Sequence, residues 1–205
     1  MMKTKIAVFV SGGGTNLQAL IDAEAAGKIP DGEIALVLSS RRDAYALKRA
    51  ESASIETAVV SKKECKDGAE FEKAILAALE KHGIEMIVLA GFMSILSADF
   101  TARYKDRILN VHPSLIPSFC GAGFYGLRVH EAALAYGVKV TGATVHYVNE
   151  IPDGGQILLQ KAVEIREGDT PEILQRRVME EAEWILLPKA TAMVATRIKN
   201  EKTEK

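Results

Sequence analysis

The stretch Ile6-Ala7-Val8-Phe9-Val10-Ser11-Gly12-Gly13-Gly14-Thr15-Asn16 decides the fold class. It begins with a short β-branched apolar run, which is typical of a buried strand. Three glycines then form a turn, and a helical pattern follows directly from Leu17. A strand that passes through a tight turn into a helix is the first half of a βαβ unit. The stretch therefore predicts an α/β protein.

The same alternation of short apolar runs and helical patterns continues through the first half of the chain. It favours a mostly parallel sheet with helices on both faces, because parallel strands need crossover helices that cover the sheet. The expected strands are residues 6–10, 34–38, 57–60, 86–89 and 108–111, and the expected helices lie near residues 17–26, 44–53, 71–81 and 98–104.

The pattern changes in the second half of the chain. Residues 139–148 and 157–165 are longer strand candidates joined by a turn-rich segment, which predicts an antiparallel addition to the sheet. Thr170-Pro171-Glu172 predicts a helix start, with Thr170 as the N-cap. We expect this helix to run through Trp184 and, after Pro188, toward Ile198.

The bulk composition is that of a globular protein. The chain has 205 residues, 48% of them hydrophobic and 26% charged, and a formal net charge of −1. This length fits one domain, which we expect to span residues 1–198, followed by a charged tail, residues 199–205, that we expect to fray. The balanced charge argues against an extended nucleic-acid or anionic-membrane surface.

The N-terminal segment and the two cysteines bear on the cellular location of the protein and on metal binding. The apolar run in residues 1–10 leads directly into Gly12 and is too short for a signal peptide or a membrane span. Cys65 and Cys120 have no metal-ligand spacing and are interpreted as reduced thiols. The sequence predicts a cytoplasmic protein without a metal.

The glycine-rich turn, residues 11–16, is a candidate anion site. Glycines let a backbone approach an anion closely, and the helix start offers free N–H groups. A P-loop is excluded because no Gly-Lys-Ser/Thr follows, and a dinucleotide fingerprint fits poorly because Leu17 replaces the third glycine. A simple tight turn is the alternative, but a small phosphate ester is the preferred ligand. Thr15 or Asn16 is expected to cap the helix.

The segment Asn110-Val111-His112-Pro113-Ser114 closes another apolar run. Side chains alternate along a strand, so Asn110 and His112 should project from the same face. Pro113 places them at the end of the strand, where ligands bind in parallel α/β sheets. An amide and an imidazole that both face this mouth are suited to stabilising a negative oxygen. The other histidines, His82, His130 and His146, are interpreted as structural, with His146 able to brace the site from behind.

Two further segments each keep two interpretations at this stage, and a third has one. Asp153-Gly154-Gly155 is either a turn between strands or a catalytic carboxylate that favours a protonated imidazole. The loop Leu89–Leu96 is either core packing or a wall for a flat heteroaromatic ligand. Glu180, Glu181 and Glu183 fit a solvated helix face.

Taken together, these segments resemble the phosphoribosylglycinamide formyltransferase family. The resemblance runs from Ile6 to about Pro188 and rests on SGGGTNLQALID (11–22), VLAGFMSIL (88–96), LNVHPSLIPSF (109–119), VTGATVHYV (140–148) and DGGQILLQ (153–160). It implies a formyltransferase-type Rossmann-like α/β fold. It also implies transfer of a formyl group from 10-formyltetrahydrofolate, as co-substrate, to the amine of N1-(5-phospho-D-ribosyl)glycinamide in purine biosynthesis.

The resemblance assigns roles position by position. Asn110, His112 and Asp153 match the family's catalytic trio. The phosphosugar site is matched by Gly12, Gly13, Gly14, Thr15, Asn16 and, counted back from Pro188, Glu183. The folate site is matched by Leu89, Phe92, Met93, Ser94, Ile95, Leu96, Asn110, Val148 and Glu150.

Three positions depart from the family pattern. Ser94 stands where many relatives carry Arg or Lys, and Gly68 stands near the place of another folate-contacting Arg, for which Lys63 or Lys66 is a candidate replacement. The stretch Cys120–Gly126 is longer than the usual link after the His-Pro-Ser segment.

The expected partners are small molecules, without nucleic acid, membrane or metal, and the chain is expected to be a monomer or a weak homodimer. A formyltetrahydrofolate hydrolase and a methionyl-tRNA formyltransferase are the nearest rivals, but both carry an additional domain. A nicotinamide-dependent oxidoreductase that uses Arg41 and Arg42, and a non-catalytic phosphosugar-binding module, are the rivals from other classes.

Overall fold

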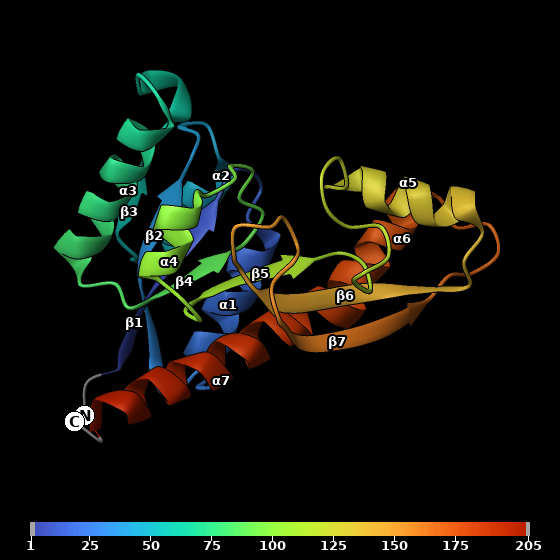
Figure 1. Cartoon of the computed structure of the whole chain (residues 1–205). Helices are drawn as coiled ribbons and strands as arrows, with labels where there is room; N and C mark the ends of the chain where they lie inside the picture. Colours follow the sequence, from blue (N-terminus) through green and yellow to red (C-terminus); the bar gives the residue numbers. More distant parts are fainter. Residues whose placement is uncertain (1–2, 204–205) are drawn as a thin grey trace.

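The computed structural model describes residues 3–203 and contains one seven-stranded sheet with the strand order β3-β2-β1-β4-β5-β6-β7 (Figure 1). Strands β1 to β5 are parallel, and β6 and β7 are antiparallel additions. The α/β fold class and the antiparallel C-terminal addition are therefore confirmed. The strands are β1 (Thr4–Val10), β2 (Gly32–Ser39), β3 (Thr57–Val59), β4 (Met86–Leu89), β5 (Ile108–His112), β6 (Val140–Tyr147) and β7 (Ile157–Glu164).

Helices connect the parallel strands and continue after β5 and β7, close to where the sequence predicts them. They are α1 (Thr15–Ala25), α2 (Tyr45–Ser52), α3 (Gly68–His82), α4 (Ala98–Arg103), α5 (Leu127–Tyr136), α6 (Pro171–Val178) and α7 (Trp184–Thr203), with a short 3-10 turn, η1 (Lys62–Glu64), and a π-helical turn, η2 (Met179–Glu183).

Two hydrophobic cores form, one on each face of the sheet. Helices α1, α6 and α7 cover one face, and α3 and α4 cover the other (Figure 1). Along β5, Leu109 and Val111 point into the first core and Ile108 into the second. Because strand side chains alternate, Asn110 and His112 share the face of Ile108. On that face, Asn110 and His112 lie outside the region that α3 and α4 cover.

Side chains cap three of the helices, and the cap at Thr170 confirms the prediction from the sequence. Asp67, Ser97 and Thr170 cap α3, α4 and α6, each accepting a backbone N–H three residues later. Helix α1 begins instead after Gly14, which has a φ of 75° and makes no side-chain cap bond. The expectation that Thr15 or Asn16 caps this helix is wrong. A Cβ at position 14 would lie 2.6 Å from the Cβ of Ala46, so only glycine fits this turn.

The C-terminal segment also differs from expectation. Residues 199–203, which we expected to fray, form the last turn of α7. Lys199 pairs with Asp31, and Lys202 Nζ lies 2.8 Å from Glu85 Oε2, so the charges of this segment meet acidic partners in the loops before β2 and β4. Residues 204–205 of the predicted tail lie outside the described residues.

Helix α7 closes the first core. It has 20 residues, continues through Pro188 and buries Leu187, Val194 and Ile198. Within residues 3–203, none of the helices combines the length and the apolar character that crossing a membrane requires.

Two neighbouring positions on α7 test this packing. Leu187 is fully buried, whereas Ile185 is 49% exposed. We expect Leu187→Ala to lower the free energy of unfolding by about 2–5 kcal/mol, because it leaves a cavity in a packed core. Ile185→Ala should cost well under half of that, as measured by denaturant unfolding. Equal losses would contradict the placement of α7.

Candidate active site

The antiparallel register of β5 and β6 creates a row of polar side chains. Asn110 lies opposite His146, and His112 lies opposite Thr144. Residues opposite one another in a sheet point to the same face, so these four side chains form one group. The strand patterns predict Asn110 and His112 on one face, and the cross-strand register adds His146 beside Asn110.

The loop after β6 brings Asp153 to this group. One carboxylate oxygen, Oδ1, lies 3.5 Å from Asn110 Nδ2 and 3.6 Å from His146 Nε2. The other, Oδ2, lies 3.4 Å from His112 Nδ1. Asp153 has a φ of 55°, in the left-handed region, and is followed by Gly154 and Gly155. A Cβ on Gly155 would lie 1.7 Å from the Tyr147 carbonyl oxygen, so the close return of the loop requires glycine there.

His112 is buried and held at both ring nitrogens. Its Nδ1 faces Asp153, and its Nε2 lies 2.9 Å from the Phe119 carbonyl oxygen. Both partners are hydrogen-bond acceptors, so an imidazolium that donates from both nitrogens satisfies them together. The expectation that His112 points openly into the mouth is wrong in this respect, because the segment after Pro117 covers its Nε2.

Asp153 is suited to remain ionised. Burial by itself raises the pKa of Asp153, but the Gly121 N–H and the charge of His112 oppose burial, and the pKa lies below its ordinary value. The Gly121 N–H donates to Asp153 Oδ2 at 2.8 Å. Sequence reasoning missed the Phe119 carbonyl and the Gly121 N–H because backbone groups leave no residue-type signal.

A cavity of 130 Å³ opens beside these groups. Asn110, His146 and Asp153 form its polar side. The remaining wall includes most residues that the resemblance assigns to a folate site, namely Leu89, Phe92, Ser94, Ile95, Leu96, Val148 and Glu150. Met93 is the exception: it is 59% exposed, and its backbone N–H donates to Ser11 Oγ at 3.0 Å.

The glycine-rich turn directs its carbonyl groups toward α2. Gly12 O accepts the Ala46 N–H at 3.0 Å, and Gly13 O accepts Arg49 Nε–H at 2.9 Å. The first N–H groups of a helix have no intrahelical partner, and α1 has no side-chain cap that would occupy them. The turn therefore presents backbone donors and the positive end of the helix dipole to an anion.

Glu183 joins this turn from the other end of the chain. Asn16 Nδ2 donates to Glu183 Oε2 at 2.7 Å, and Glu183 is buried within the π-helical turn η2. Burial raises the pKa of Glu183 to about 7, although the Asn16 hydrogen bond opposes the shift. The solvated-face interpretation is wrong for Glu183, whereas exposed Glu180 and Glu181 contact Arg176 and Arg166.

The other histidines lie apart from this chemistry. His82 ends α3 and contacts the Ala78 carbonyl and Glu56, as expected of a residue at a helix end, although its side chain is only 14% exposed. His130 is fully buried, and within residues 3–203 neither ring nitrogen has a hydrogen-bond partner, so the expectation of a bonded structural histidine is wrong. Burial, with a contribution from His112, lowers the pKa of His130 to about 4 and keeps the ring neutral.

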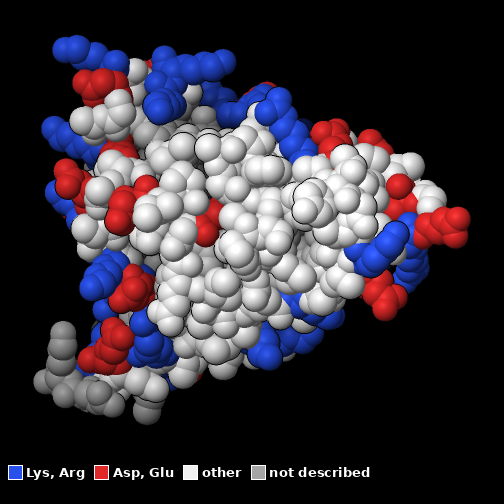
Figure 2. Space-filling model, turned by 45° about the vertical axis from the view of Figure 1, so that its right-hand side comes forward, with Lys and Arg blue, Asp and Glu red and all other residues white. Residues whose placement is uncertain are grey.

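The positions that depart from the family pattern are spread around the mouth. Gly68 is the first residue of α3 and lines a groove of 920 Å³ that also contains Lys73 and Arg103. The extended segment, residues 120–126, carries the Gly121 N–H that reaches Asp153. Residues 113–127 contain no Lys, Arg, Asp or Glu. Figure 2 shows a broad uncharged area on one face of the molecule, with charged side chains around its margins.

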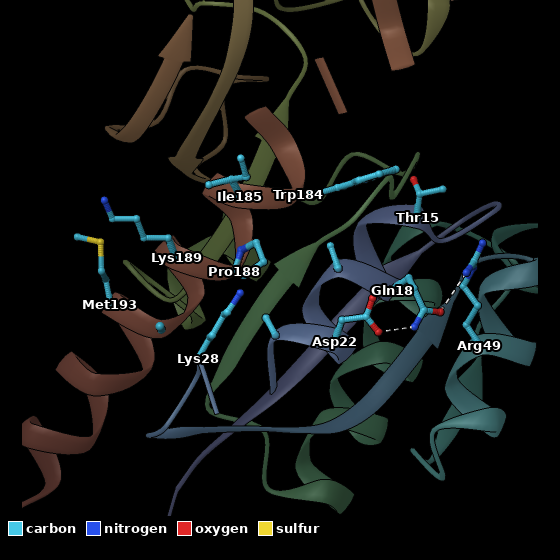
Figure 3. A pocket seen from close by; sticks show the side chains of 13 residues that line it. Thr15, Gln18, Asp22, Lys28, Arg49, Trp184, Ile185, Pro188, Lys189 and Met193 are labelled. Atoms are coloured by element: carbon cyan, nitrogen blue, oxygen red, sulfur yellow. Dashed lines mark hydrogen bonds between the residues drawn. The ribbon is translucent and has the colours of Figure 1, made fainter. Parts of the chain in front are cut away.

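A separate hollow of 730 Å³ lies between α1 and α7 (Figure 3). Gln18 there bonds both Asp22 and Arg49, and Lys28 and Lys189 contribute to its lining. Thr15 is the one predicted site residue in its lining. Within residues 3–203, His, Cys, Asp and Glu side chains form no group of three or more that could hold a metal ion.

Comparisons with known proteins agree with this arrangement. A family described as formyl transferase matches residues 4–191, and the chain belongs to this family. Within it, the chain belongs with the phosphoribosylglycinamide formyltransferases. The Haemophilus influenzae protein of that name is 44% identical over 177 residues, which cover 86% of this chain and 81% of that protein. The crystal structure of glycinamide ribonucleotide transformylase 1 from Symbiobacterium toebii matches with a TM-score of 0.88 at 39% identity, covering 95% of this chain and 88% of that one.

Some relatives are much longer. The trifunctional purine biosynthetic protein adenosine-3 of Gallus gallus is 45% identical over 95% of this chain. The chain spans only 19% of that protein's length.

The raised pKa of Glu183 predicts a pH-dependent stability. Between its ordinary pKa of 4.5 and about 7, the folded state binds this proton more tightly than the unfolded state, so stability falls as pH rises. Glu183→Gln stays neutral and should exceed the wild type in free energy of unfolding at pH 8 by about 1–3 kcal/mol. At pH 5 the two should nearly agree in denaturant titrations.

Exposed Glu181→Gln is the matched control, and it should leave the pH dependence unchanged. A Glu183→Gln variant with the wild-type pH dependence would contradict a buried, neutral Glu183.

Proposed function

We propose that this chain transfers the formyl group of 10-formyltetrahydrofolate to the amine of N1-(5-phospho-D-ribosyl)glycinamide, as a step of purine biosynthesis. The observation that carries the proposal is the position of Asp153, which lies 3.5 Å from the Asn110 amide nitrogen and 3.4 Å from His112 Nδ1. His146 lies within 3.6 Å of both Asn110 and Asp153, and an apolar cavity opens beside these three residues. Its assignment to these substrates is supported by the similarity to proteins named phosphoribosylglycinamide formyltransferase.

The cavity beside β4 and β5 is proposed to take the folate. Its wall combines apolar side chains such as Leu89 and Val148 with backbone of the loop after β6, which suits a flat ring with polar edges. Asn110 would lie at the end of this cavity, next to the formyl group.

The glycine-rich turn and the start of α1 are proposed to take the phosphate of the second substrate. Free N–H groups and the helix dipole favour an anion there. Asn16 and Glu183 lie at the same turn and would hold the sugar. The Met93 N–H bonds Ser11 Oγ, so the loop proposed for folate contacts the turn proposed for phosphate. Binding at both loops would align the amine with the formyl carbon.

The proposed reaction starts with attack of the neutral amine on the formyl carbon, which gives a tetrahedral oxyanion. The Asn110 amide would donate to this oxygen. The oxyanion would also replace the Phe119 carbonyl as the acceptor of His112 Nε2–H, while Asp153 holds the positive ring through Nδ1. Collapse of the intermediate breaks the bond between the formyl carbon and N10 of the folate, and the proton that the attacking amine loses passes through Asp153 or water to N10, so that tetrahydrofolate is released.

The main competing function is hydrolysis of the formyl donor, in which water replaces the amine. The candidate anion site at the glycine-rich turn, which contacts the proposed folate loop through Ser11 and Met93, favours the transferase. We expect the folate product, followed spectroscopically, to form rapidly only when glycinamide ribonucleotide is present. Equal rates with and without the phosphosugar would indicate a hydrolase, and no product under either condition would indicate a binding protein.

The proposed roles of Asn110 and His112 can be tested by single-turnover kinetics. Asn110→Ala and His112→Ala should each slow formyl transfer by about 10²–10³-fold, the effect of one lost oxyanion donor. Asn200→Ala and His82→Ala remove the same groups far from the site and should transfer at the wild-type rate. Wild-type turnover in either site variant, with folding confirmed by circular dichroism, would remove that residue from the mechanism.

Several expectations stay predictions. They are a single domain over residues 1–198, a monomer or weak homodimer, a cytoplasmic location, and small-molecule partners without nucleic acid, membrane or metal.

A further inference from the structure

His146 lines the cavity together with Asn110 and Asp153 and contacts both of them. Its Nε2 lies 3.2 Å from Asn110 Nδ2 and 3.6 Å from Asp153 Oδ1. Its Nδ1 lies 2.8 Å from the carbonyl oxygen of the next residue, Tyr147. The ring is 2% exposed, so bulk water does not compete for these positions.

The Tyr147 carbonyl fixes the tautomer of the ring. A carbonyl oxygen only accepts hydrogen bonds, so Nδ1 carries a proton. In the neutral ring Nε2 is then an acceptor, and only the NH₂ end of the Asn110 amide is complementary to it. If the amide were turned over, its oxygen would face the lone pair of Nε2, and that contact would be repulsive.

A cationic His146 would reverse this preference. It would donate from Nε2 and attract the Asn110 carbonyl oxygen or the Asp153 carboxylate. The Asp153 oxygen lies beyond hydrogen-bond distance, at 3.6 Å, whereas the Asn110 nitrogen is closer, at 3.2 Å. Asp153 already receives the Gly121 N–H and faces His112, so it does not need a proton from His146. The geometry fits the neutral ring.

We propose that His146 is a positioning residue that locks the Asn110 amide with its NH₂ group inward and one N–H available to the substrate oxygen. This inference rests on the proposed function of Asn110. The amide nitrogen has two hydrogens, of which one is held by His146 Nε2. The second makes only a long contact with Asp153 Oδ1, at 3.5 Å, so it can turn to the oxyanion without reorientation of the amide.

The fold supports this role. The antiparallel pairing of β5 with β6 runs without a register shift and places His146 opposite Asn110. Residues opposite one another in a sheet point to the same face, so the pairing itself brings the ring to the amide.

Two substitutions separate the two ring nitrogens. In His146→Gln the side-chain amide reaches the Nε2 position and its oxygen can accept from Asn110. In His146→Asn the amide reaches only the Nδ1 position. We expect His146→Asn to lower kcat for formyl transfer by about 10²–10³-fold, as for a lost oxyanion donor, with little change in KM for either substrate. His146→Gln should stay within about tenfold of the wild type.

Equal activities of the Gln and Asn variants, whether both high or both low, would overturn the inference, because packing alone does not distinguish them. In an Asn110→Ala background, adding His146→Asn should cause no further loss. A second loss of full size would show that His146 acts independently of Asn110 and would also overturn it.

Wild-type turnover of Asn110→Ala would instead refute the proposed function of Asn110 and remove the basis of the inference. Nitrogen-15 NMR of the wild type supplies a test that needs no variant to fold. The His146 spectrum should show a protonated Nδ1 and an Nε2 without a proton. A proton on Nε2 would overturn the inference.

Discussion

The antiparallel return of β6 along β5 is the constraint on which the site depends. It places His146 opposite Asn110 and Thr144 opposite His112. It also places the end of β6 next to Asn110, so the loop that follows β6 starts close to the site and can bring Asp153 into it. Because strand side chains alternate, a register slip of one residue would turn His146 to the face that α7 covers, and the polar group would not form.

Gathering these polar groups requires strained backbone at two residues and hydrogen-bond partners for the buried polar atoms. Asp153 and Phe119 both have positive φ angles, which non-glycine residues adopt rarely. Each contributes to the site: Asp153 through its carboxylate and Phe119 through its carbonyl. Buried polar groups are tolerated when they are satisfied, and the Gly121 N–H and the Tyr147 carbonyl satisfy Asp153 and His146. Backbone groups of two loops therefore hold the side chains in place.

The two proposed substrate sites meet where the strand order reverses. β1 and β4 are neighbours in the sheet although their sequence positions are far apart, and each ends in a loop at the same edge. This reversal is where α/β sheets open a crevice for ligands. The contact between Ser11 and Met93 links the two loops, and Glu183 reaches the glycine turn from the distant end of the chain. A formyl transfer between two bound molecules needs such a junction, because both must be held at once.

The sequence by itself determined the α/β class, the strands and the glycine-rich turn, because periodicity, glycine and proline act through local sterics. The segment Asn110–Ser114 likewise indicated a candidate site at the end of a strand, and β5 does end at His112. Only the tertiary structure decided how the site is built. The pairing of β5 with β6, the burial of Glu183 and the cover over His112 depend on contacts between residues far apart in the chain. The pKa of an ionisable group and the hydrogen bonds that it makes depend on the groups around it, and no local sequence pattern records those surroundings.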